Sequence, residues 1–121
     1  MEGIGDMTVA QLVERFTAIA LDQYEAQQRH NVTKVNRLFD QMEALEEELK
    51  KREGDQRWAL LPLYDHPVLH VRLKAALATL AVAPKEARSL LEEIGAKNRN
   101  LQGLDANMTL RQLDNGEFKP T

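Results

Sequence analysis

The stretch that decides the fold reads HPVLHVRLKAALATLAVAP, from His66 to Pro84, and a proline stands near each of its ends. Between the two prolines, apolar residues occupy nearly every angular position of a helix. That pattern is typical of a helix that neighbours cover over most of its circumference. We therefore predict a central helix over residues 68–82, on which the rest of the chain packs.

The composition indicates one globular domain over residues 1–121. The chain has 121 residues, with 43% hydrophobic and 29% charged residues, which is enough to form a single core. A net charge of −3, with basic residues scattered among acids, does not favour a nucleic-acid surface.

The same composition bears on location. The chain contains no cysteine, which excludes disulfides and thiolate chemistry and favours a reducing cytoplasm. No apolar run approaches the roughly 20 residues needed to cross a bilayer, and the N-terminus lacks the features of a secretory signal. We expect a cytoplasmic protein without a membrane partner.

Two long helices are predicted in the N-terminal half, after a flexible segment over residues 1–6. Thr8 and Gln11 have the spacing of a capping box, and an apolar face continues from there to about residue 27. A second apolar stripe then steps by threes and fours through Val35, Leu38, Met42, Leu45 and Leu49. This stripe predicts an antiparallel hairpin with the first helix, or else the seam of a self-associating homodimer.

Shorter elements are predicted in the C-terminal half. A third helix over residues 56–64 contains Pro62, which should bend it, and Pro84 suits the first turn of a helix that follows the central one. Polar, turn-prone residues without periodicity at 97–100 and 102–103 predict a loop over residues 96–107. Residues 108–121 are expected to form a short helical turn and a tail that is either docked or frayed.

Part of this pattern resembles a HEAT repeat, over residues 60–67 and 71–80. In that family a proline-bent helix leads through an aspartate turn into a second helix that opens with Val-Arg and continues with small residues. The resemblance implies an all-α fold, an α-α superhelix of about five helices built from HEAT-like hairpins. It also implies that Asp65 and Arg72 form the ladder that ties one layer to the next.

A second resemblance covers nearly the whole chain. The sequence is similar to small bacterial proteins grouped as domain of unknown function twenty-nineteen. The matching segments are LLPL at 60–63, HP at 66–67, VRLKAA at 71–76, ATLAVAP at 78–84, MTL at 108–110, LD at 113–114, Gly116 and FKP at 118–120. This resemblance implies an α-superhelical fold and no assigned activity.

Residues that could carry chemistry do not form a recognisable catalytic pattern. His66 and His70 are four apart, a spacing that can hold a metal on one helical face, but Pro67 lies between them, and we predict no metal and no cofactor. Ser89 lies within a helical pattern and not in a nucleophile elbow. We therefore assign no catalytic residue.

The sequence favours a protein-interaction or adaptor module with an unidentified protein partner, because helical superhelices expose grooves whose side chains vary freely. His70 and Lys74, one turn apart, are the first candidates for the groove, and Arg57 and Trp58 are the others. One alternative is a self-associating structural homodimer. The other is a small enzyme or nucleic-acid-binding protein that uses a groove lined by His70, Lys74 and Trp58.

Overall fold

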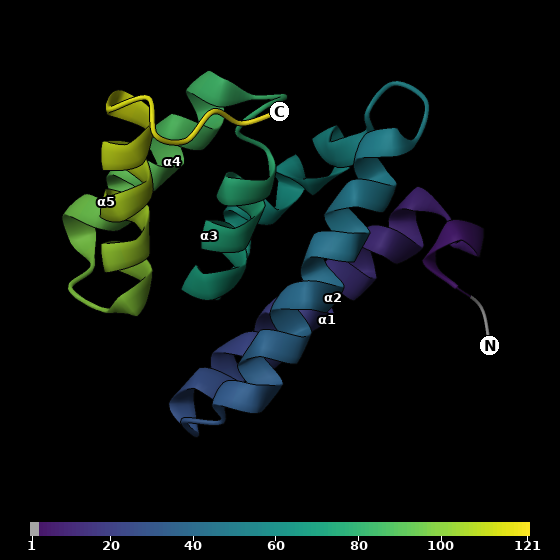
Figure 1. Cartoon of the computed structure of the whole chain (residues 1–121), viewed down its shortest axis with the longest axis horizontal. Coiled ribbons are helices and arrows are strands. Elements are labelled where there is room, and N and C mark those ends of the chain that lie inside the picture. The colour runs from purple at the N-terminus through teal and green to yellow at the C-terminus, as the bar shows by residue number, and fades with distance from the viewer. Residues whose placement is uncertain (1–2) are drawn as a thin grey trace. The chain divides into compact units, whose positions relative to one another are not determined.

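The computed structural model describes residues 3–121, and its regular elements are all helices (Figure 1). This confirms the all-α prediction. In chain order the elements are η1 (Ile4–Asp6), α1 (Val9–Gln28), α2 (Val32–Lys51), η2 (Gln56–Asp65), α3 (Leu69–Ala78), α4 (Pro84–Lys97) and α5 (Leu101–Asp114), where η marks a 3-10 helix. Within the described residues, none of these helices is long and apolar enough to cross a membrane.

Contacts between residues divide the chain into two compact units, Met1–Leu60 and Leu61–Thr121. The sequence predicts a single domain, and nothing in its composition marks a division inside η2. The first unit contains α1 and α2, and the second contains α3, α4 and α5.

The first unit is a hairpin of two 20-residue helices (Figure 1). The predicted capping box starts α1: the Thr8 hydroxyl accepts a hydrogen bond from the Gln11 N–H, and the Gln11 side chain accepts one from the Thr8 N–H. Four members of the predicted stripe on α2 are buried: Leu38, Met42, Leu45 and Leu49. The four buried members of the stripe therefore lie in the hairpin of this chain, where α2 contacts α1.

The sequence predicts a flexible segment over residues 1–6, within which the structure has one regular turn. Ile4–Asp6 form a 3-10 turn, and the Arg52 guanidinium donates hydrogen bonds to the carbonyls of Ile4 at 3.1 Å and Met7 at 2.9 Å. The same guanidinium pairs with the buried Glu48 at 2.6 Å. An arginine 48 residues away thus fixes this segment, and no local pattern reveals it. Residues 1 and 2 lie outside the described part of the chain.

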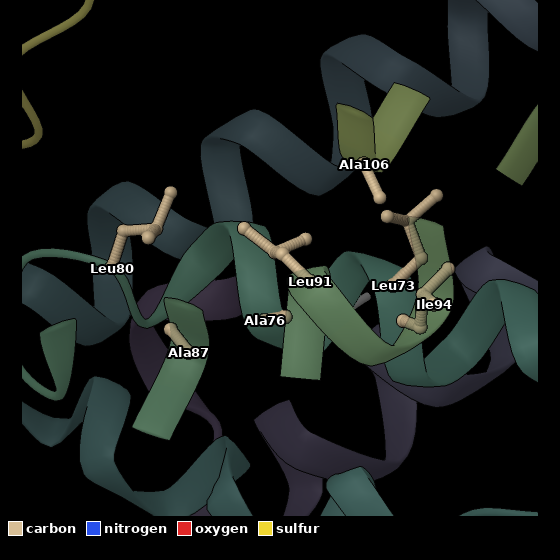
Figure 2. Packing of buried hydrophobic residues seen from close by; sticks show 7 residues of the cluster. All are labelled: Leu73, Ala76, Leu80, Ala87, Leu91, Ile94 and Ala106. Atoms are coloured by element: carbon tan, nitrogen blue, oxygen red, sulfur yellow. The ribbon is translucent and has the colours of Figure 1, made fainter. Parts of the chain in front are cut away.

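The second unit packs α3, α4 and α5 around one apolar cluster (Figure 2). Figure 2 shows the seven buried members, which come from all three helices and the turn after α3: Leu73, Ala76, Leu80, Ala87, Leu91, Ile94 and Ala106. Alanines at three of these positions keep the side chains short, so the helices can approach closely. Pro84 stands in the first turn of α4, as predicted.

The central helix is shorter than predicted, ending at Ala78 and not at residue 82. The Thr79 hydroxyl donates to the carbonyl of Ala75 at 2.8 Å and also bonds the Tyr64 hydroxyl. The following residues form a turn, in which the N–H of Ala83 donates to the Thr79 carbonyl. Apolar composition continues through this turn, which is why periodicity alone extends the helix.

The predicted loop over residues 96–107 is wrong, because α4 runs to Lys97 and α5 begins at Leu101. The connection is reduced to three residues, and two asparagines close it. Asn98 donates its amide N–H to the carbonyl of Ile94, and the Asn100 side chain accepts from the N–H of Gly103 as the N-cap of α5. Polar residues that resemble a loop are here the ends of two helices.

The expected short helical turn after residue 108 is in fact the second half of the 14-residue helix α5. This helix ends before Gly116, which has a positive φ of 73°. The N–H groups of Glu117 and Phe118 then donate to the carbonyl of Gln112. The chain therefore folds back onto the last turn of α5 as far as Phe118.

Candidate interaction surface

His70, the first residue predicted to line a groove, is buried. It exposes 2% of its surface, and its Nδ1 lies 3.2 Å from the Gln102 Nε2, which joins α3 to α5. Burial, with a smaller contribution from the charge of Lys74, lowers the pKa of His70 from 6.5 to about 4. The prediction that His70 faces an open groove is wrong, because its partner, 32 residues away, draws it into the second unit.

His66 lies in the turn that leads into α3. Its Nδ1 accepts a hydrogen bond from the N–H of Val68 at 3.0 Å, so the ring supports the turn. Among the described residues there is no group of three or more His, Cys, Asp or Glu side chains that could hold a metal ion.

The predicted ladder between Asp65 and Arg72 does not form. Arg72 donates instead to the carbonyl oxygens of His66, at 2.7 Å, and Pro67, at 3.2 Å. Asp65 is exposed. The guanidinium thus fastens the turn before α3 to the helix that follows it, a role that needs only backbone acceptors.

The remaining predicted groove residues are divided between the two units. Arg57 and Trp58 belong to the first unit, where the Arg57 guanidinium pairs with Asp55 at 2.6 Å. That pairing lowers the pKa of Asp55 and raises the pKa of Arg57. Trp58 is half exposed, and Lys74 is half-buried on α3 in the second unit.

A surface that the sequence did not predict lies on α5. Leu101, Leu104 and Met108 expose 62%, 56% and 47% of their surfaces. Their spacing of three and four residues places them in one row along one face of the helix. We call these three residues the α5 row. The row was missed because residues 96–107 were predicted to be a loop, in which spacing has no meaning.

Two exposed arginines flank the α5 row, Arg99 just before the helix and Arg111 in its last turn. Within the described part of the chain, neither guanidinium forms a hydrogen bond or an ion pair. Nearby charges are paired, since Lys97 bonds Glu93 at 3.2 Å and Arg88 bonds Asp114 at 2.8 Å. The α5 row is thus an apolar strip with an uncompensated positive charge near each end.

The family assignment rests on a match of residues 10–114 to the profile described as Domain of unknown function (DUF2019). This range begins at the second residue of α1, ends at the last residue of α5, and includes the whole of α2, α3 and α4. The chain belongs to the DUF2019 family. The sequence resemblance is therefore confirmed.

A solved structure resembles this DUF2019 chain over its full length. It is the crystal structure of the protein RPA1889 from Rhodopseudomonas palustris CGA009, which is 43% identical, has a TM-score of 0.95, and is aligned over 100% of both chains. No curated protein matches the chain. Neither the family description nor the name of the solved protein states an activity.

A second surface feature of this DUF2019 domain is a shallow hollow of about 300 Å³ beside α1. Its lining mixes polar and apolar side chains: Met7, Gln11, Glu14, Arg15 and Ala18. Gln11 is already engaged in the capping box. The hollow has neither the enclosure nor the convergent polar groups of a small-molecule site.

Proposed function

We propose that this DUF2019 chain is a protein-interaction module, an adaptor that binds a partner protein through the α5 row. The observation that carries the proposal is the exposure of Leu101, Leu104 and Met108 on one helical face. Single exposed apolar residues are ordinary on protein surfaces, whereas an ordered row on a folded helix is typical of helix-mediated binding.

The energy available from the row is suitable for a modest interface. Full burial of a leucine or methionine side chain stabilises by roughly 1.5–3 kcal/mol, and about half of each of these three surfaces remains to be covered. Covering the row would then contribute on the order of 3 kcal/mol. Micromolar affinity corresponds to about 8 kcal/mol, so contacts beyond the row must supply the remainder and offset the entropic cost of association.

The finer architecture that we propose is the HEAT-like one indicated by the sequence. Antiparallel helix pairs joined by short connections support it, since three residues join α1 to α2 and three join α4 to α5. In repeat proteins of this kind, the stacked hairpins create extended concave surfaces that bind partners. The cytoplasmic location stays a prediction.

The test places a photo-reactive amino acid at residue 104 in cells that express the protein natively, and at residue 32 as the control. Val32 is a matched position because it exposes 68% of its surface and lies on α2. We expect one protein to be cross-linked from residue 104 and not from residue 32.

Binding of that protein is then measured with purified components. Leu104→Glu should weaken binding at least tenfold, and Val32→Glu should leave it unchanged, with both variants as helical as the parent by circular dichroism. Equal binding by Leu104→Glu and the parent would refute the role of the α5 row. Absence of any cross-link specific to residue 104 would do the same.

A further inference from the structure

We infer that the partner presents an apolar helical segment flanked by acidic residues. This inference rests on the proposed function and deepens it by naming the chemistry of the partner. It is carried by the two exposed arginines, Arg99 and Arg111, that stand near the ends of the α5 row without a partner among the described residues.

The charges around the row favour carboxylates over ammonium groups. Arg99 precedes the N-terminus of α5, where the helix dipole adds further positive potential. Arg111 lies beside Leu104 in the helical projection, and the carboxylate nearest to it in sequence, Asp114, is held by Arg88. Asp105 is the acidic residue on the α5 face that carries the row, and it is half-buried. The balance along the row is therefore positive.

A second copy of this chain suits the row poorly. In a two-fold symmetric contact the same patch meets itself. A parallel pairing of α5 with its copy brings Arg99 to Arg99 and Arg111 to Arg111, while an antiparallel pairing brings Arg99 to Arg111. Either arrangement places like charges together, which opposes association.

The spacing of the arginines defines a probe. At a rise of 1.5 Å per residue, the helical part of this interval, from Leu101 to Arg111, spans about 15 Å, and Arg99 lies two residues before it. A partner helix should therefore carry glutamates about 12 residues apart, with leucines at intervals of three and four between them. The probe is a synthetic fluorescent peptide with this pattern, and its matched control has lysines in place of the glutamates.

The experiment measures fluorescence anisotropy of both peptides against the full-length protein at low salt. We expect the glutamate peptide to bind at least tenfold more tightly than the lysine peptide. The double variant Arg99→Glu, Arg111→Glu should reverse that preference. Arg37→Glu, which changes an exposed arginine on α2, should preserve it.

Equal binding of the two peptides, or binding of neither, would overturn the inference. Those results would not refute the proposed function, because the cross-linking experiment tests it without regard to the charge of the partner. Sedimentation should give a monomer; a dimer that Leu104→Glu dissociates would identify a second copy as the occupant. Capture by vesicles containing anionic phospholipid that is lost in Leu104→Glu would identify a membrane, and either outcome overturns the inference.

Discussion

Replacing Gly103 by alanine should destabilise the protein, although alanine is the better helix former. Gly103 is the third residue of α5 and is buried. A Cβ built there overlaps the carbonyl oxygen of Asn98 and lies 2.8 Å from its carbonyl carbon. The obstacle is backbone in the tight turn between α4 and α5, so relief requires the two helices to move apart.

The magnitude follows from two opposing effects. Overpacking costs about 1–3 kcal/mol, and the upper end applies here because no side chain can rotate away. The helical preference of alanine over glycine returns up to about 1 kcal/mol. We therefore expect Gly103→Ala to lower the free energy of unfolding by about 2 kcal/mol.

Gly95 provides the matched control on the facing helix. A Cβ at Gly95 meets the side chain of Asn107, whose amide N–H donates to the Gly95 carbonyl at 3.2 Å. Asn107 is exposed, so it can turn into solvent at the loss of one hydrogen bond, about 1 kcal/mol. That loss offsets the gain in helix propensity, and Gly95→Ala should stay within about 1 kcal/mol of the parent.

Urea unfolding of the parent, Gly103→Ala and Gly95→Ala is followed by circular dichroism. The unfolding midpoints are compared where the slope of the free energy of unfolding against urea concentration is the same for all three proteins. Adding Asn107→Ala to Gly95→Ala should remove the remaining obstruction. No equivalent repair exists for Gly103. If Gly103→Ala proves as stable as Gly95→Ala, the close approach of α5 to the Asn98 carbonyl is refuted.

Two further predictions concern α3. Burial holds the pKa of His70 at about 4 in the folded protein, whereas the ordinary value is 6.5. As the pH falls, the unfolded chain therefore takes up the proton first. The contribution of His70 to the free energy of unfolding should be constant above pH 6.5 and fall by about 3 kcal/mol between pH 6.5 and 4. Urea unfolding at several pH values across that range should show that the free energy of unfolding falls more steeply with decreasing pH in the parent than in His70→Gln. The same pH dependence in both proteins would contradict a buried neutral imidazole. Arg72→Ala should lower the free energy of unfolding by about 1 kcal/mol through the loss of its hydrogen bonds to the carbonyls of His66 and Pro67. Asp65→Ala should change the free energy of unfolding by less than about 0.5 kcal/mol. Equal losses in the two variants, measured by thermal unfolding, would instead support the predicted ladder between Asp65 and Arg72.

Sequence by itself determined the features that depend on neighbours within a turn or two. The capping box of Thr8 and Gln11, the apolar stripe of α2 and the proline in the first turn of α4 are local patterns, and each appears where it is predicted. They suffice for the all-α fold, because helix periodicity and caps are properties of short segments. The resemblance to the DUF2019 family likewise needed only the order of residues.

Tertiary structure decided which polar side chains remain available. His70 resembles a surface residue until Gln102, 32 positions later, meets it inside the second unit. Arg52 is one of several charges at the end of α2 until its guanidinium reaches the carbonyls before α1. Residues 101–108 resemble a loop until Asn100 caps them and Gly103 lets them pack against the turn. These outcomes depend on groups distant in sequence, because burial and hydrogen-bond partners are fixed only when the helices pack.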